Sequence, residues 1–153
     1  MPTVRQGASG GAINNKFYVA GGFNGANVGA VEVYDPGTGA WTSLAPMPNM
    51  RSFAAHDVLN GKLYIAGGRT SGGTPLTTFD VFDPVANTWT NLPPMPTARA
   101  YSAMASANGI LYVMGGSTDG GTGYTDAVES FNPATGVWST SAPPMPQIGR
   151  AHV

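Results

Sequence analysis

The sequence contains no cysteine, few charged residues and no long apolar run. Without cysteine there is no disulfide, no thiolate metal ligand and no cysteine nucleophile. The apolar runs fall well short of the roughly 20 residues that a membrane-spanning helix needs, and the first residues do not resemble a signal peptide. We therefore expect a soluble protein, and the lack of cysteine favours the cytoplasm as its compartment.

Charge is scarce as well, since Lys, Arg, Asp and Glu make up 10% of the 153 residues and the formal net charge is −1. Such a chain has no basic footprint for nucleic acid or for an anionic membrane, so neither is an expected partner. Glycine and proline, in contrast, number 22 and 13. Both destabilise helix interiors, so the composition predicts an all-β fold of short strands joined by tight turns.

One strand-like apolar segment occurs three times, and each copy ends in two glycines. The three copies are residues 16–22, 62–68 and 110–116. Two further markers recur in the same phase, namely a tryptophan (Trp41, Trp89, Trp138) and a Pro-Met-Pro triplet (46–48, 94–96, 144–146). The first glycines of the pairs are 46 and 48 residues apart. A period of this length is typical of a repeat array.

Turn chemistry predicts the order of strands within each unit. The pairs Asn14-Asn15, Asn60-Gly61 and Asn108-Gly109 suit a type I′ hairpin turn before the glycine-ended strand. A polar loop follows, and then a third strand whose alternation predicts one solvated face. An Asp-Pro or Asn-Pro turn with a left-handed last residue leads into the tryptophan strand. We predict four-stranded antiparallel units at about 5–45, 51–93 and 99–143, and the start of a further innermost strand at 148–153.

These features resemble the kelch repeat. The glycine doublet, the third-strand aromatic (Tyr34, Phe82, Phe131), the Asp/Asn-Pro turn and the tryptophan all have kelch spacing over essentially the whole chain. The resemblance implies a β-propeller, in which each repeat forms one blade around a central channel. The small residues of each first strand would then belong to the innermost strand, where the blades converge and leave the least room for side chains.

Three units cannot close a ring by themselves, because propellers have four to eight blades. A three-blade arc leaves two apolar blade faces bare, and repeats take their stability from their neighbours. Two arrangements remain open: a homodimer that joins head to tail into a six-bladed ring, and a segment of a longer single-chain propeller. In the dimer, residues 150–153 would overlap the place of residues 5–8 of the second copy.

An arginine precedes each innermost strand, and these arginines are candidate ligand contacts. In a propeller they would form a ring of guanidinium groups at one mouth of the channel, suited to carboxylates and other anions. The kelch resemblance adds that propellers that bind acidic peptides use this position. The alternative is structural, because Glu32, Asp80 and Glu129 also recur once per unit and each could pair with an arginine.

The function expected from these patterns is that of a non-enzymatic scaffold that binds a peptide or a small anionic ligand at the channel rim. The polar loops after the glycine pairs vary between units, and binding residues tend to lie on such loops. Ordinary surface loops are the alternative. Tyr124, Tyr101 and Phe53 are the candidate aromatic anchors, and for Phe53 core packing is the favoured alternative. The candidate ligand-binding residues are Arg51, Arg99, Arg5, Arg150, Tyr101, Asn24, Ser71, Thr118, Asp119 and Tyr124.

Catalysis has little support, and no catalytic residue, metal site or cofactor is predicted. The two histidines, His56 and His152, lie in different units, whereas a metal site needs three or four convergent ligands. The kelch enzymes of the galactose oxidase type require a cysteine. Two alternatives stay open: a carbohydrate-active propeller fragment, similar to a sialic acid mutarotase, that uses His56, Asp57 and Arg51, and an engineered or minimal half-propeller without an evolved ligand.

Overall fold

The computed structural model describes residues 1–146, and within them it contains twelve strands in three sheets and no helix. The strands are β1 (Ser9–Ile13), β2 (Lys16–Ala20), β3 (Val31–Asp35), β4 (Ala40–Leu44), β5 (Ala55–Leu59), β6 (Lys62–Ala66), β7 (Phe79–Asp83), β8 (Thr88–Leu92), β9 (Ala103–Ala107), β10 (Ile110–Met114), β11 (Val128–Asn132) and β12 (Val137–Ser139). The all-β prediction is confirmed. No helix in this part of the chain is long and apolar enough to span a membrane.

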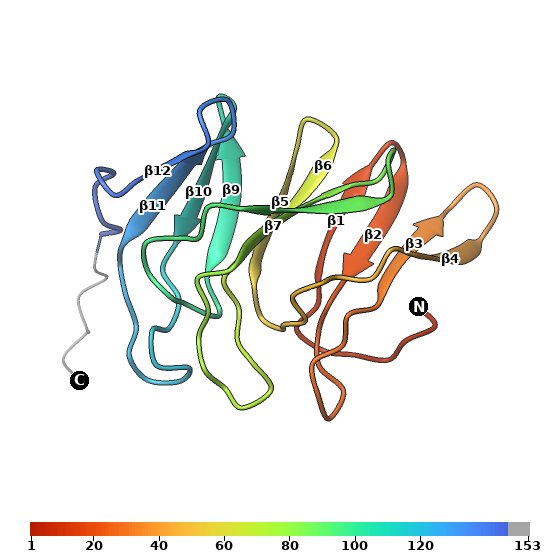
Figure 1. Ribbon diagram of the computed structural model, residues 1–153, viewed down its shortest axis with the longest axis horizontal. Helices are drawn as coiled ribbons and strands as arrows, with labels where there is room; N and C mark the ends of the chain where they lie inside the picture. The colour runs from red at the N-terminus through yellow and green to blue at the C-terminus, as the bar shows by residue number, and fades with distance from the viewer. Residues whose placement is uncertain (147–153) are drawn as a thin grey trace, which may run out of the picture.

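Each sheet consists of four consecutive strands, and every neighbouring pair is antiparallel. We call the sheets blade 1 (β1–β4), blade 2 (β5–β8) and blade 3 (β9–β12). The three blades lie in a row (Figure 1). The first strands β1, β5 and β9 contact one another between blades, so they are the innermost strands. The arrangement is that of three successive propeller blades.

The turns have the backbone geometry that the sequence predicts. Asn60 and Gly61 in the β5–β6 hairpin have φ values of 51° and 72°, as a type I′ turn requires. The glycine doublet is left-handed too, with φ of 65° at Gly67 and 92° at Gly68. A Cβ atom on Gly68 would lie 2.8 Å from the carbonyl oxygen of Ser52. Glycine is therefore needed here for its backbone conformation and for the close approach of the next segment.

The hydrophobic core consists of two clusters, one in each space between neighbouring blades. The cluster between blades 1 and 2 includes Ile13, Val31, Val33, Met47, Leu63, Ile65 and Phe82. The cluster between blades 2 and 3 includes Ala66, Phe79, Val81, Met95, Leu111, Val113 and Phe131. Each large aliphatic side chain buried there stabilises the fold by about 1.5–3 kcal/mol. The blades are thus held together face to face, and a blade without a neighbour keeps an open apolar face.

The predicted solvated face of the third strands is wrong. Glu32, Asp80 and Glu129 are the polar residues of that alternation, and only 0–2% of each is exposed. Each of these strands lies inside its sheet, and the face that carries the acidic residue is covered. The acidic side chains tolerate burial because each has an arginine partner. The predicted innermost strand at 148–153, with Arg150, lies outside the described residues.

Candidate ligand site at the start of the innermost strands

Arg5, Arg51 and Arg99 form buried ion pairs within their own blades. Arg51 Nη1 lies 2.6 Å from Asp80 Oδ2. Arg99 Nη2 lies 2.8 Å from Glu129 Oε1, and Arg5 pairs with Glu32. The three arginine side chains have no exposed surface (0%). Of the two readings left open by the sequence, the structure shows the structural pairing.

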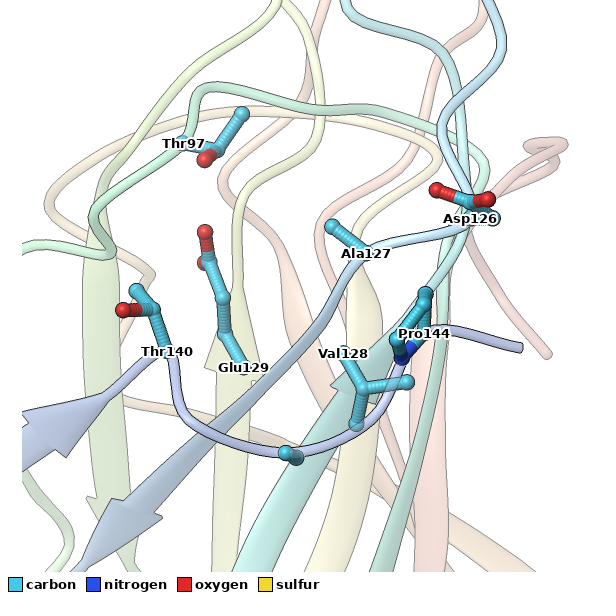
Figure 2. A pocket seen from close by; sticks show the side chains of 8 residues that line it. Thr97, Asp126, Ala127, Val128, Glu129, Thr140 and Pro144 are labelled. Atoms are coloured by element: carbon cyan, nitrogen blue, oxygen red, sulfur yellow. The ribbon is translucent and has the colours of Figure 1, made fainter.

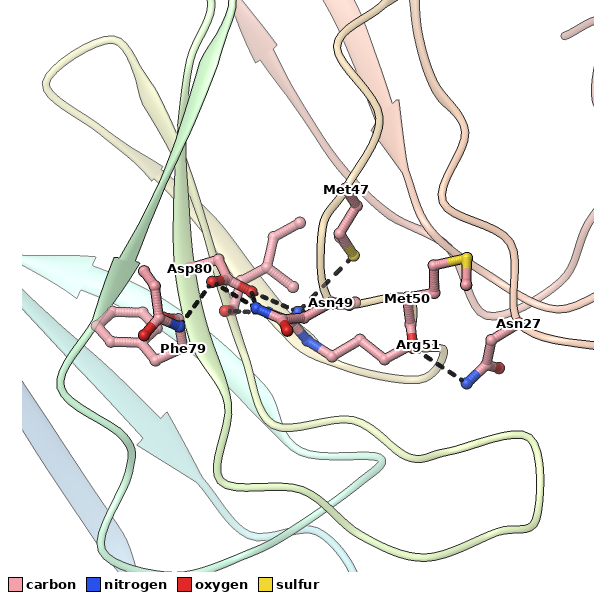
Figure 3. A network of polar contacts seen from close by, with 9 residues as sticks. Asn27, Met47, Asn49, Met50, Arg51, Phe79 and Asp80 are labelled. Carbon is pink, nitrogen blue, oxygen red and sulfur yellow. Dashed lines mark hydrogen bonds and ion pairs between the residues drawn. The ribbon is translucent and has the colours of Figure 1, made fainter.

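The pair in blade 2 is part of a wider polar network (Figure 3). Arg51 donates through Nη2 to the Ile65 carbonyl at 2.8 Å and through Nη1 to the Asn49 carbonyl at 2.9 Å. Asp80 accepts from the side-chain amides of Asn49 and Asn91 at 3.0–3.3 Å. Burial lowers the pKa of Arg51, and the nearby Asp80 carboxylate opposes this effect. Ligand binding by these arginines stays a prediction. A ligand would have to displace the carboxylate that each arginine already contacts.

A different arginine, Arg69, lies over two aromatic rings where the innermost strands of blades 2 and 3 begin. Its Cζ is 4.6 Å from the ring centroid of Phe53 and 5.2 Å from that of Tyr101. The two rings contact each other with centroids 4.9 Å apart. Phe53 and Tyr101 hold equivalent positions, two residues after Arg51 and Arg99. The expected core packing of Phe53 is wrong, because its ring belongs to this stack and to neither core cluster.

Both aromatic residues have a left-handed backbone, with φ of 54° at Phe53 and 58° at Tyr101. Such a conformation costs a bulky residue on the order of 1–3 kcal/mol. Gly7 holds the equivalent place in blade 1 with φ of 60°, and a Cβ there would lie 2.7 Å from the Phe53 ring. Backbone hydrogen bonds keep this geometry in place: Phe53 N donates to Gly7 O at 2.8 Å, and Tyr101 N to Phe53 O at 2.9 Å. The two rings therefore form a platform that is held rigidly.

The Arg69 guanidinium is uncommitted. Within residues 1–146 it makes no hydrogen bond and no ion pair, whereas the other arginines there are all paired with carboxylates. Its main chain is held firmly, since Arg69 N donates to Ser52 O at 2.9 Å and Arg69 O accepts from Asn27 Nδ2 at 2.8 Å. In the sequence, Arg69 belongs to the variable loop after the second glycine pair, and it is not among the predicted ligand-binding residues. The signal that could have found it is the change from Phe23 to Arg69 to Ser117 at one repeat position.

Two further predicted residues lie in the loops of blades 1 and 2. Ser71 accepts a hydrogen bond through Oγ from the main-chain N of Asn27 at 2.8 Å, so it links the two loops. Asn27 also accepts from the Ser52 hydroxyl through Oδ1 at 2.9 Å. Asn24 is exposed, and its N donates to Ala26 O within the loop. Ser71 therefore supports the position of the Arg69 loop.

The predicted residues of the blade 3 loop mainly hold that loop together. Asp119 Oδ1 accepts from Gly121 N at 2.8 Å and from Thr122 N at 2.9 Å. The backbone N–H of Gly121, then that of Gly123, and the side-chain hydroxyls of Ser117 and Thr122 hold the Asp119 pKa well below its usual range. Thr118 Oγ1 donates to the Gly123 carbonyl at 3.0 Å. Tyr124 is 79% exposed, so it is free to contact a ligand.

Other polar groups lie apart from this stack. A hollow beside the Arg99–Glu129 pair is lined by Thr97, Asp126, Glu129 and Thr140 among others (Figure 2). His56 Nδ1 lies 3.2 Å from the carbonyl oxygen of its neighbour Ala54. Within residues 1–146 no three His, Asp or Glu side chains are grouped so that they could hold a metal ion.

Comparisons with known proteins agree with this architecture. The profile of the KLHDC2/KLHL20/DRC7 Kelch-repeats domain matches residues 1–152. A solved structure titled "Structure of YjhT" superposes with a TM-score of 0.80 at 21% sequence identity, over 91% of this chain and 52% of the other. The chain thus spans about half the length of that protein. A search of curated proteins found no match. With its residues matched almost from end to end, the chain belongs to the Kelch-repeat family.

Proposed function

We propose that the chain is a non-enzymatic β-propeller scaffold, and that it binds a peptide or small ligand through a carboxylate at Arg69. The observation that carries the proposal is the uncommitted guanidinium of Arg69 above the Phe53 and Tyr101 rings. A guanidinium presents paired donors that match the two oxygens of a carboxylate. Stacking on the aromatic faces contributes about 0.5–1 kcal/mol and leaves the edge of the guanidinium plane free for a ligand.

The aromatic platform supports a binding role because it is costly to build. Two bulky residues keep a left-handed backbone where blade 1 has glycine. Strain of this kind is found where a site must be preorganised. A preorganised arginine loses little conformational entropy when its ligand arrives, which improves affinity. Tyr101, which contacts Arg69 and Phe53, is the predicted residue best placed to extend the contact beyond the carboxylate.

The test uses a tetraglutamate peptide and its tetraglutamine analogue, both amidated at the C-terminus so that only the first carries carboxylates, titrated against the protein by isothermal calorimetry. We expect the acidic peptide to bind and the amide peptide to bind at least 10-fold more weakly. Arg69→Gln should lower the affinity for the acidic peptide by about 10- to 100-fold, because a charge-assisted hydrogen bond contributes about 1.5–3 kcal/mol. Arg69→Lys keeps the charge but loses the paired donors. Its affinity for the acidic peptide should therefore lie between that of the unaltered protein and that of Arg69→Gln.

Lys62→Gln is the matched control, because it removes an exposed cation at the opposite end of an innermost hairpin. It should leave peptide affinity unchanged. Equal affinity for both peptides, or an Arg69→Gln variant that binds as tightly as the unaltered protein, would show that this site does not recognise carboxylates. Thermal melts of each variant separate loss of binding from loss of folding.

A further inference from the structure

The two joints between neighbouring blades use the same hydrogen bond from a tryptophan side chain. We define a joint as the contact between one blade and the next along the chain. Trp89 Nε1 in blade 2 donates to the Ala45 carbonyl in blade 1 at 3.0 Å. Trp138 Nε1 in blade 3 donates to the Pro93 carbonyl in blade 2 at 2.8 Å. Ala45 and Pro93 each stand two residues before a buried methionine, so the two contacts are equivalent.

Two backbone hydrogen bonds are also repeated in both joints. In the first, the later blade donates to the earlier one: Phe53 N to Gly7 O, then Tyr101 N to Phe53 O. In the second, the glycine doublet of the earlier blade donates to the arginine carbonyl of the later one. These bonds are Gly22 N to Arg51 O and Gly68 N to Arg99 O, both at 2.9 Å. Every joint therefore contains three hydrogen bonds with fixed directions.

The two end blades carry the halves of a third joint, and these halves have no partner among residues 1–146. On blade 1 these are the Gly7 N–H, the Arg5 carbonyl and the Trp41 indole N–H. On blade 3 they are the Tyr101 carbonyl, the Gly116 N–H and the Pro143 carbonyl. No hydrogen bond to any of these six groups is formed among residues 1–146. Each donor on one end blade thus corresponds to an acceptor on the other.

The apolar faces at the two ends match in the same way. Leu63 and Leu111 are fully buried (0% exposed) where blades 2 and 3 meet the preceding blade. The equivalent residue of blade 1, Phe17, is 46% exposed. On the opposite side, Met47 is 3% exposed in the first joint, whereas its equivalent Met145 in blade 3 is 37% exposed. The chain thus has one open face of each kind.

We propose that a second copy of this chain occupies both open faces, so that two copies form one six-bladed ring. Blade 1 of each copy packs on blade 3 of the other through the three hydrogen bonds and through Phe17 and Met145. In this ring, residues 5–8 of one copy take the repeat position that residues 150–153 of the other copy would otherwise hold. Two arcs related by a two-fold axis along the channel give two identical joints and leave no open end. The occupant is a second copy because the open groups of the chain complement one another. Coverage of 52% of a solved relative also leaves room for an equal arc.

Sedimentation equilibrium of the 153-residue chain tests the proposal. The protein concentration runs from about 1 µM to about 100 times that value. We expect a limiting mass of twice 15.7 kDa with no larger species. Phe17→Asp should weaken association by at least 100-fold, because each ring would bury two unpaired carboxylates. Trp41→Phe removes one hydrogen bond from each of the two joints. At about fivefold per bond, it should weaken association by about 25-fold.

Val85→Asp is the matched control, because Val85 is 90% exposed in the turn between β7 and β8. It places the same charge on the same fold and should leave the dissociation constant unchanged. A folded monomer at every concentration would overturn the proposal, and so would an open-ended series of oligomers. It would also fail if the Phe17→Asp and Val85→Asp variants dimerised equally well. Circular dichroism of the variants confirms that each one is folded.

Discussion

Removal of the carboxylate from the buried pair in blade 2 should be among the most damaging single substitutions in the protein. Asp80→Ala leaves the Arg51 guanidinium with no exposed surface and no counter-charge. It also removes the acceptor of the Asn49 and Asn91 side-chain amides. Breaking a buried ion pair by deleting one partner costs about 3–5 kcal/mol. Since domains are stable by about 5–15 kcal/mol, the loss is a large share of the total.

Urea unfolding followed by tryptophan fluorescence measures this loss, with protein concentration held constant for all variants. With a slope of about 2 kcal/mol per molar urea, the unfolding midpoint should fall by about 2 M. Replacing both partners together, as Arg51→Met with Asp80→Leu, should recover most of the stability, because the desolvation penalty of both charges is removed. The double variant separates the cost of an orphaned charge from the net value of the pair.

The control breaks an ion pair of similar length on the surface. Lys62 Nζ lies 2.9 Å from Asp83 Oδ2, but the two side chains are 45% and 28% exposed. Water and salt screen such a pair, so Lys62→Ala should barely move the midpoint. Equal midpoint shifts for Asp80→Ala and Lys62→Ala would contradict this prediction. A double variant no more stable than Asp80→Ala would contradict it too.

Three smaller predictions follow from backbone geometry and from the blade 3 loop. Phe53→Gly should be more stable than Phe53→Ala by about 1 kcal/mol in urea unfolding, because φ is 54° there; the opposite order would exclude backbone strain. Asn15→Gly should raise the melting temperature, since Asn15 has φ of 60° in a type I′ turn, and a lower value would contradict that turn type. The depressed pKa of Asp119 implies that its loop bonds persist above pH 4 and are lost only as pH falls through the folded value. The Gly121 amide signal in NMR should therefore titrate well below the ordinary aspartate range, and a midpoint near pH 4 would refute the bonds to this carboxylate.

The sequence predicted the blade architecture because that information is local and repeated. Asn60-Gly61 and Gly67-Gly68 can adopt left-handed backbone at little cost, so they mark turns wherever they occur. The tryptophans mark the last strand of each unit, and their rings stack on the third-strand aromatics, as Trp89 does on Phe82 at 5.0 Å. Such signals need no knowledge of distant contacts.

The site was harder to predict because it depends on contacts between blades. Arg51 recurs once per unit and Arg69 does not, but only the fold shows that Arg51 is buried against Asp80 and that the Arg69 guanidinium is uncommitted. Phe53 and Tyr101 were candidate aromatic anchors, but their contact with each other was not predicted, for another reason. Aromatic residues seldom adopt a left-handed backbone, so propensity argues against the conformation that the neighbouring blades impose.

Hydrogen exchange at the three tryptophan indole N–H groups is the most direct test of the proposed six-bladed ring of two copies. Trp89 and Trp138 form their joints within one copy, so their N–H groups should exchange more slowly than a free indole at any concentration. In the proposed two-copy ring, Trp41 forms its joint only with the second copy. We predict that its N–H is protected in concentrated solution and loses protection on dilution, while Trp89 does not change. A Trp41 indole that exchanges at the free rate in concentrated protein would contradict the account.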